Sequence, residues 1–260
     1  MINGVKRFIP DNLKPFEKSN SFMNKKRVLI QQKKKQSNTV FLDSIEEAFD
    51  LFNIKSGSCL SFHHHLRNGD HVLQSVCEII KKKDLNKLHF APSSIFPSYT
   101  NLVDLIMEGR VVDIHTNYIN GPVAKVVSQG YLKGKLTMNT HGGRARAIES
   151  GDLKIDYAFI ACPVVDKEGN GTGAFGKSAC GTLGYAISEM QYEDKVILVT
   201  DTVIESLEEF QIDKNFVDAV VVVDSIGDAS GIVSWTTQLT KDPIGLKIAK
   251  DCADVLDFLG

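Results

Sequence analysis

A run of three histidines contains the first residues whose types and spacing could do chemistry. The segment His63–Asp70 reads HHHLRNGD and lies between the β-rich run Ser58–Phe62 and a helix-like segment that begins at Asp70. Such a junction offers free backbone N–H groups and the positive end of a helix dipole, which favour a carboxylate, a thioester oxygen or a phosphate. Arg67 could hold a carboxylate through two parallel hydrogen bonds. We therefore expect substrate or oxyanion binding by Phe62, His63, His64, His65, Arg67, Asn68 and Gly69.

Two other interpretations of the histidines remain open. Alternate residues of a strand face the same side, so His63 and His65 could converge on a metal ion while His64 points away. Two ligands make a weak site, and we predict that no metal binds here. The structural alternative is a polar loop that packs around Asn68–Gly69, a residue pair typical of turns.

A second candidate site is the stretch Asn139–Arg146, NTHGGRAR, which also lies between a short strand and a helix. Its two consecutive glycines let the backbone approach a ligand closely. Arginines at the start of a helix have the wrong sign for its dipole, which indicates that an anion offsets them. The alternative is a helix entry with surface arginines. We expect anion or phosphate binding by His141, Gly142, Gly143 and Arg144.

The third candidate is a glycine-rich loop, Asp166–Ser178, which follows the apolar run Tyr157–Cys162. Its residues Gly171–Ser178 fit G-x-x-x-x-G-K-[ST], the P-loop pattern, and Gly171–Gly176 fit G-x-G-x-x-G, the dinucleotide pattern. In both motifs the glycines begin where the strand ends, whereas eight residues intervene here. The loop could cradle a phosphate, line a thioester channel or form a hairpin that turns at Lys167–Asn170.

Two further carboxylates, Glu189 and Glu193, precede the apolar run Val196–Thr200. Taken alone, each is expected to be a surface charge, because glutamate is rarely buried without a partner. The sequence contains no G-x-S-x-G elbow, so a serine acyl hydrolase is not indicated. No catalytic nucleophile can be named from these residues.

The elements that must position these residues alternate between apolar runs and helix-like segments. Such alternation predicts an α/β fold, with a mostly parallel sheet and helices on both faces. Ligands of such sheets bind beyond the carboxyl ends of the strands. Strands are expected over Ser58–Phe62, Lys87–Ala91, Val111–His115, Leu136–Met138, Tyr157–Cys162, Val196–Thr200, Val217–Val223 and Ile232–Trp235. Helices are expected over Asp43–Phe52, Asp70–Lys83, Tyr99–Glu108, Pro122–Gln129, Arg144–Ser150 and Lys247–Leu259.

The 260 residues carry a net charge of -2 that is unevenly distributed. Residues 1–40 hold ten Lys/Arg and two Asp/Glu, a balance of +8, which leaves a balance of -10 for residues 41–260. We therefore divide the chain into a basic N-terminal arm, residues 1–38, and one α/β domain, residues 39–260. The arm is expected to dock on the acidic body or on a sister subunit. Nucleic acid is the less favoured partner, because the arm shows no sequence pattern of a helix-turn-helix motif.

The cysteines and the apolar runs bear on the compartment. The five cysteines form no C-x-x-C pair and lie mostly in apolar surroundings, so buried free thiols in a reducing compartment are expected. The N-terminus shows no signal-peptide pattern, and no apolar run is long enough to span a bilayer. Together these features predict a cytoplasmic protein.

Three stretches together resemble the alpha subunit of bacterial citrate lyase, a family within the CoA-transferase superfamily. They are Phe62–Asp70 (FHHHLRNGD), Thr140–Glu149 (THGGRARAIE) and Ile155–Pro163 (IDYAFIACP), the last followed by Asp166 and Gly169–Asn170. The resemblance covers more of the chain than either glycine motif. It implies an α/β fold of the CoA-transferase and ribose-phosphate-isomerase type.

The resemblance also implies a function. It implies a citrate CoA-transferase that exchanges acetate for citrate on the thiol of phosphoribosyl dephospho-CoA, a CoA-like prosthetic group. The implied partners are the beta and gamma subunits of citrate lyase, of which gamma is the acyl carrier, and no membrane is implied. The loop Phe62–Gly69 would then bind citrate and the oxyanion, and His141–Arg144 would bind citrate or a phosphate of the prosthetic group. The channel for the CoA-like group would be lined by Gly169, Asn170, Gly171 and Gly173.

A full alpha chain of this family has a second, similar domain, which we expect to be absent here. The catalytic glutamate of related CoA-transferases belongs to that second domain, so the catalytic residue stays unassigned. Exchange is therefore expected only when the second half is supplied. Two other functions remain open: a non-catalytic ligand-sensing or assembly module on the same fold, and a nucleotide-binding enzyme that uses Gly171–Ser178.

Overall fold

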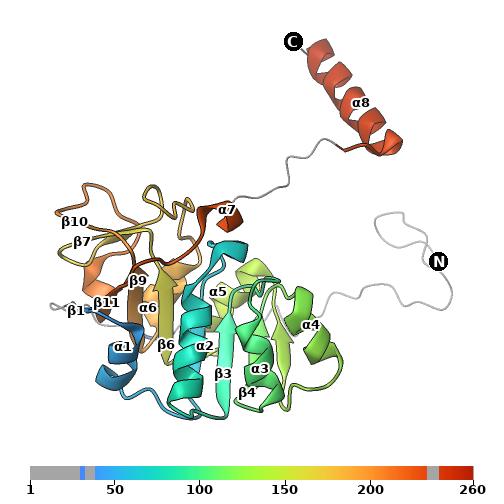
Figure 1. Cartoon of the computed structure of the whole chain (residues 1–260). Helices are drawn as coiled ribbons and strands as arrows, with labels where there is room; N and C mark the ends of the chain where they lie inside the picture. The colour runs from blue at the N-terminus through green and yellow to red at the C-terminus, as the bar shows by residue number, and fades with distance from the viewer. Residues whose placement is uncertain (1–29, 33–38, 233–239, 260) are drawn as a thin grey trace.

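An eight-stranded sheet forms the centre of the protein, seen here in a computed structural model that describes residues 30–32, 39–232 and 240–259 (Figure 1). Neighbouring strands of this sheet are all parallel. The predicted α/β fold with a mostly parallel sheet is thereby confirmed. In order across the sheet the strands are β1 (Val40–Leu42), β11 (Ala219–Val222), β9 (Lys195–Thr200), β6 (Tyr157–Ala161), β2 (Cys59–Phe62), β3 (Leu88–Pro92), β4 (Val111–Thr116) and β5 (Leu136–Met138).

Helices cover both faces of the sheet (Figure 1). One face carries α1 (Ile45–Leu51), α2 (Val72–Lys82), α3 (Asn101–Met107) and α4 (Gly121–Ser128), whose buried side chains share one core cluster. The other face carries α5 (His141–Glu149) and α6 (Ala186–Tyr192), which pack against each other. The remaining helices are α7 (Ala229–Ile232), α8 (Pro243–Leu259) and two 3₁₀ helices, η2 (Arg67–Gly69) and η3 (Lys214–Phe216).

Helix α2 follows the histidine loop, and the side chain of Asp70 caps the start of this helix. The Asp70 Oδ1 atom accepts hydrogen bonds from the backbone N–H groups of Val72 and Leu73 at 2.7 and 3.2 Å. Burial raises the pKa of this carboxyl to about 6. The helix then buries one face at helical spacing. The side chains on that face are Val72, Leu73, Val76, Cys77 and Ile80.

A second, three-stranded sheet is built mainly from the chain that follows β6 (Figure 1). Its order is β10 (Val203–Ile204), β7 (Val164–Asp166) and β8 (Gly171–Thr172), and β7 pairs with β8 in antiparallel fashion. The turn between them is closed by Asp166 Oδ1, which accepts from the N–H groups of Glu168 and Asn170 at 3.0 and 2.9 Å. The hairpin interpretation of the glycine-rich loop is therefore confirmed.

Some elements differ from the sequence predictions. Strand β1, helix α6 and strand β10 were not expected, because each element is too short to show a periodic pattern. Ile232, predicted to begin a strand, is the last residue of α7, and residues 233–239 lie outside the described residues. That strand prediction is wrong at Ile232, since the close approach of α7 to η2 fixes a helical turn there.

The two ends of the described chain add little to the sheet. The predicted basic arm lies outside the described residues except for residues 30–32, where the Ile30 N–H donates to the Glu149 carbonyl at 3.0 Å. Helix α8 exposes apolar side chains, with Phe258 88% exposed. Among the described residues, no helix has the length and apolar character needed to cross a membrane.

His65 ties the histidine loop to the neighbouring strand. Strand β2 runs parallel to β6, so the residues after both strands meet. The Nε2 atom of His65 lies 2.8 Å from the carbonyl oxygen of Ala161. A carbonyl only accepts, so Nε2 carries the hydrogen of the neutral ring. Burial, together with the nearby His63, lowers the pKa of His65 to about 3.

We predict that His65 makes the fold less stable below neutral pH. In the unfolded chain histidine titrates at about pH 6.5, whereas the folded ring takes up a proton only at about pH 3. The unfolded state therefore binds more protons in this window, and stability falls as the pH drops from about 6.5 toward 3. Between pH 8 and pH 5, His65 alone should lower the free energy of unfolding by about 2 kcal/mol.

Denaturant unfolding of the wild-type protein and of His65→Gln measures this contribution. Glutamine keeps an N–H donor for the Ala161 carbonyl but does not titrate. The loss between pH 8 and pH 5 should be smaller in the variant by about 2 kcal/mol, with the pH 8 values correcting for altered packing. Equal losses in the two proteins would show that His65 is not held neutral by the fold.

Candidate functional site

A cleft opens where the carboxyl ends of the parallel strands β2, β3, β4 and β5 meet. Its volume is about 470 Å³, which lies within the range of small-molecule sites. Helices α5 and α6 form its walls together with the histidine loop. The lining residues are His64, His141, Ala145, Thr182, Gly184, Tyr185 and Ser188. The structure thus brings together one residue from each of the first two predicted stretches.

Tyr185 lies beside both histidines of the cleft. Its ring centroid is 5.2 Å from that of His64, in an edge-on arrangement, and 5.5 Å from that of His141. The Tyr185 hydroxyl accepts a hydrogen bond from Asn117 Nδ2 at 3.2 Å. Burial raises the pKa of Tyr185, so its hydroxyl is neutral. Sequence reasoning missed this residue, because a lone tyrosine between Gly184 and Ala186 carries no pattern.

Ser93, which follows β3, holds the His64 ring. The His64 backbone N–H donates to Ser93 Oγ at 3.0 Å, and His64 Nδ1 lies 2.7 Å from the same oxygen. The serine hydroxyl is then free to donate to Nδ1, which leaves the ring hydrogen on Nε2. Burial, followed by the charges of His65 and His141, lowers the pKa of His64 to about 4. His64 is therefore a neutral ring with an N–H donor.

The N-terminus of α5 reaches the cleft at His141. Thr140 caps the helix, because its Oγ1 accepts from the N–H of Gly143 at 3.1 Å. The first N–H groups of a helix have no acceptor within the helix, so those of His141 and Gly142 are available to an anion. A Cβ at Gly142 would meet nothing within 4 Å, so the space beside it is open. This geometry suits the predicted anion site at His141, Gly142 and Gly143.

The side chain of Arg144 lies in the protein interior, where it pairs with Glu189. Its side chain is fully buried, and Nη2 lies 2.5 Å from Glu189 Oε1 and 2.6 Å from the Ala91 carbonyl oxygen. The guanidinium therefore faces Glu189 rather than the cleft. The alternative of surface arginines at this helix start fits Arg146 but not Arg144, since Arg146 is exposed and pairs with Asp152 at 2.8 Å.

The two carboxylates expected at the surface are buried, and that expectation is wrong. Glu189 and Glu193 are 0% and 2% exposed. Glu189 Oε2 accepts from Ser61 Oγ at 2.7 Å and lies 3.2 Å from His63 Nε2. Burial, followed by the charge of Arg144, lowers the pKa of His63 to about 3. The seven residues of α6 gave no periodic signal, so nothing in the sequence placed Glu189 on a core-facing helix or Glu193 at the end of that helix.

The other predicted residues of the histidine loop lie away from the cleft. Phe62 points into the core and stacks on Phe159, with ring centroids 5.9 Å apart. Arg67 and Asn68 are exposed, and Arg67 has a positive φ of 51°. Gly69 is buried under the segment after β11, where a Cβ would lie 2.2 Å from the Asp228 carbonyl oxygen. This glycine is required by backbone packing.

Protein atoms occupy the space beside the glycines of the glycine-rich loop, so no room for a ligand is left there. A Cβ at Gly171 would lie 2.6 Å from Cys162 Sγ, and one at Gly173 would lie 2.4 Å from the Gly181 carbonyl oxygen. The neighbouring Gly169 packs on Thr39, and Asn170 Oδ1 accepts from the Lys214 N–H at 3.0 Å. None of these four predicted channel residues lines the cleft described above.

The nucleotide motifs also lack their structural context. Both require a strand, a glycine loop and then a helix. Here Gly171 lies within strand β8, and the next helix, α6, begins only at Ala186. The hydroxyl of Ser178, the last motif residue, donates to the Gly227 carbonyl at 3.2 Å. The described residues 164–192 therefore do not form a P-loop or a dinucleotide fold.

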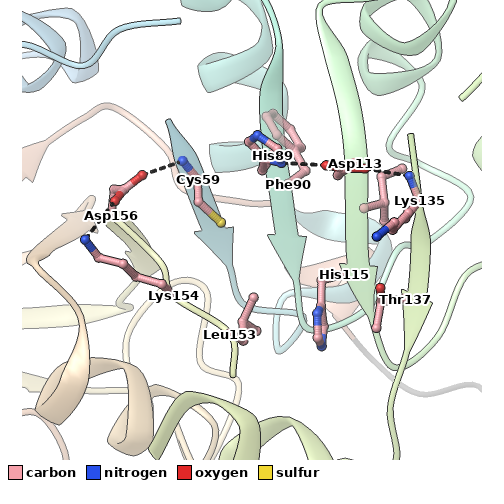
Figure 2. Close-up of a pocket in the computed structure, with 11 residues that line it drawn as sticks. Cys59, His89, Phe90, Asp113, His115, Lys135, Thr137, Leu153, Lys154 and Asp156 are labelled. Atoms are coloured by element: carbon pink, nitrogen blue, oxygen red, sulfur yellow. Dashed lines mark hydrogen bonds and ion pairs between the residues drawn. The ribbon is translucent and has the colours of Figure 1, made fainter. Parts of the chain in front are cut away.

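A second cavity, of about 310 Å³, lies on the face of the sheet (Figure 2). Cys59, His89 and Asp113 occupy neighbouring positions on β2, β3 and β4, and His89 Nδ1 lies 2.8 Å from Asp113 Oδ2. The order resembles a nucleophilic triad. Burial and the nearby Glu193, however, raise the pKa of the Cys59 thiol, so it is protonated and a poor nucleophile.

No described residues form a cluster of three or more His, Cys, Asp or Glu that could hold a metal ion. The residues that line the cleft present hydrogen-bond donors. These donors are the imidazoles of His64 and His141, three hydroxyls (Thr182, Tyr185 and Ser188) and the start of α5, which together suit an anion.

Known proteins share this sequence and fold. The family model of the citrate lyase alpha subunit (CitF) matches residues 38–259. The citrate lyase alpha chain of Haemophilus influenzae is 38% identical over 214 residues, which are 82% of this chain and 43% of that protein. The corresponding chain of Escherichia coli (strain K12) is 36% identical over 214 residues, 82% of this chain and 42% of that protein.

Solved structures agree. A protein from Streptococcus mutans, described as the alpha subunit of citrate lyase in complex with citrate, is 38% identical with a TM-score of 0.80, over 87% of this chain and 46% of that one. An acyl-CoA transferase from Escherichia coli O157:H7 is 13% identical with a TM-score of 0.57, over 81% and 54%, which shows a shared fold alone. The chain spans less than half the length of the curated relatives it matches. It belongs to the citrate lyase alpha subunit family.

Proposed function

We propose that this chain provides the citrate-binding part of a transferase that exchanges acetate for citrate on an acyl-carrier thioester, within citrate lyase. The observation that carries the proposal is the cleft lined by His64, His141 and Tyr185 at the carboxyl ends of parallel strands. Support comes from the Streptococcus mutans relative, which was solved in complex with citrate.

The lining of the cleft suits a molecule with several carboxylates. The positive end of α5 attracts negative charge, and the N–H groups of His141 and Gly142 can donate to a carboxylate oxygen. His64 adds a neutral N–H donor, and Tyr185 and Ser188 add hydroxyls. Donors fixed in place before the reaction also stabilise the oxyanion that forms during acyl transfer. The same groups thus serve binding and catalysis.

The proposed thiol carrier is phosphoribosyl dephospho-CoA on the acyl carrier protein. When bound, this group supplies the thiol that holds the acyl chain as a thioester. Its fit rests on the start of α5, where His141 and Gly142 present N–H groups and the space beside Gly142 is open. Atoms already fill the space at Gly171 and Gly173. We therefore place the group at α5 and not along the glycine-rich loop.

The cleft lacks one component of acyl exchange. Such exchange needs a carboxylate nucleophile, or a site that brings the thioester and the free acid together. None of the residues that line the described cleft is an aspartate or glutamate. The nearby Glu189 is engaged by Arg144. In our proposal the nucleophile comes from the part of the relatives' length that this chain does not span.

The proposed partners follow from the same assignment. They are the beta subunit of citrate lyase and the gamma subunit, which is the acyl carrier. The small-molecule substrates are citrate and acetate. All five cysteines of the chain are free thiols, which fits a reducing compartment such as the cytoplasm.

The absence of a carboxylate from the lining favours a second candidate function. A module that binds citrate for sensing or assembly needs donors but no nucleophile. Both candidates require citrate in the cleft, and only the transferase requires exchange. The two experiments that follow separate them.

Citrate binding by the chain tests the site. His141→Ala removes the ring at the start of α5, and we expect the Kd for citrate to rise at least about tenfold, because a hydrogen bond to a charged group contributes roughly 1.5–3 kcal/mol. Titration calorimetry measures the Kd. His89→Ala is the matched control, since it deletes a partly exposed imidazole outside the cleft and should leave the Kd unchanged. Folded wild-type protein that does not bind citrate would remove the proposal.

Acetate release tests the transferase. The chain is combined with the part of the Haemophilus influenzae alpha chain that it does not span, in a pair shown to associate. We expect this pair to release labelled acetate from an acetylated acyl carrier protein when citrate is added, and neither part alone to do so. A pair that binds citrate and releases no acetate would favour the binding module. Release by the chain alone would contradict an external nucleophile.

A further inference from the structure

We propose that Arg144 and Glu189 are positioning residues of the citrate cleft. Their buried ion pair sets the spacing of the histidine loop, α5 and α6, and thereby the spacing of the groups that bind citrate. This inference rests on the proposed function of the same cleft. Neither residue lines the cleft, so both would act through the residues that do.

The ion pair joins α5 and α6 and contacts the histidine loop, and these three elements carry His141, Ser188 and His64 of the cleft. Glu189 on α6 receives Arg144 Nη2 at 2.5 Å on one carboxylate oxygen and Ser61 Oγ at 2.7 Å on the other. Arg144 on α5 also donates to Ser61 Oγ at 3.0 Å and to the Ala91 carbonyl at 2.6 Å. His63 completes the set, with Nε2 3.2 Å from Glu189 Oε2. Two strands, two helices and one loop thus meet at this pair.

The residues of the cleft are close neighbours of these contacts in sequence. His64 follows His63 directly, and its ring enters the cleft on the other side of the chain. On α5, one helical turn separates His141 from Arg144. On α6 and its N-cap, Ser188 and Tyr185 precede Glu189 by one residue and one turn. A displacement of either charged side chain therefore moves the lining.

The chemistry of the pair favours a positioning role over a purely stabilising one. Both side chains are 0% exposed, and Arg144 Nε and Nη1 have no hydrogen-bond acceptor among the described residues. A buried ion pair with unsatisfied atoms contributes little net stability, because desolvation offsets the attraction. What it contributes is geometry, since a carboxylate and a guanidinium interact strongly only at a short distance and in a narrow range of orientations.

Glu189 is the partner of the Arg144 charge by its position, 2.5 Å from Nη2; burial raises the pKa of Glu189, and the charge of Arg144 opposes that rise. His63 is neutral, because burial and the charge of Arg144 lower its pKa to about 3. Glu193, the C-cap residue of α6, lies four residues after Glu189, and burial followed by the charge of Glu189 raises its pKa well above the usual range. The neutral form of Glu193 is thus favoured. Removing the Glu189 charge would leave a buried guanidinium without a counter-charge.

Two variants test the inference. Glu189→Gln keeps the shape of the side chain and removes its charge. The double variant Arg144→Met/Glu189→Leu removes both charges together, a replacement that often preserves stability. We expect both to raise the Kd for citrate by about ten- to hundredfold, because small displacements of binding groups have effects of this size. Circular dichroism and thermal unfolding establish which variants are folded.

Ring signals of labelled histidines give a second readout that does not need citrate. In both variants the nitrogen resonances of His64 and His141 should shift or broaden, since the Ser93 contact of His64 depends on the placement of its loop. Asp218→Asn is the matched control, because it weakens another buried carboxylate, which pairs with Lys195 at 2.9 Å and accepts from the Val196 N–H at 2.8 Å. It should lower stability and leave both the Kd and the histidine signals unchanged.

The outcomes separate this inference from the proposed function. A folded double variant with the wild-type Kd and wild-type histidine signals would overturn the positioning role. If Glu189→Gln does not fold, the double variant decides. If the wild-type chain does not bind citrate, the proposed function fails, and the histidine signals still decide whether the pair sets the cleft.

Discussion

The buried ion pair of Arg144 and Glu189 is the interaction on which the cleft depends. Parallel strands bring four loops to the same edge of the sheet, but a sheet alone does not fix how those loops sit relative to one another. The pair joins α5 to α6, both of its side chains bond Ser61 Oγ, and Arg144 also donates to the Ala91 carbonyl. The positions of the residues that line the cleft therefore depend on Arg144 and Glu189, two buried charged residues that do not line it themselves.

Much of the fold could be predicted from the sequence because its signals are local. The apolar runs that became β6, β9 and β11 are buried on both faces, and such runs are typical of parallel strands. His64 and His141 were selected because each follows a predicted strand and precedes a predicted helix, which is where an α/β sheet binds ligands, and both line the same cleft. The same rule also selected Arg144, and there it was wrong, because the guanidinium of Arg144 is buried and does not line the cleft.

The rest depends on contacts between residues far apart in the sequence. Glu189 looked like a surface charge because its partner lies 45 positions away. Glycine is equally ambiguous in a sequence, since Gly142 has open space beside it whereas Gly69 is covered by the Asp228 carbonyl. Tyr185 gave no signal at all, although it stands beside both histidines. Only the three-dimensional arrangement separates a glycine that admits a ligand from one that packs.

A crystal structure of the chain grown with citrate tests the central claim most directly. Citrate is expected in the cleft between α5 and α6, in contact with His64, His141 and Tyr185, with the Arg144–Glu189 pair intact beneath it. Citrate in the sheet-face cavity beside His89 and Asp113 (Figure 2) would contradict the assignment of the site. An Arg144 guanidinium that leaves Glu189 to bind citrate itself would contradict the positioning role.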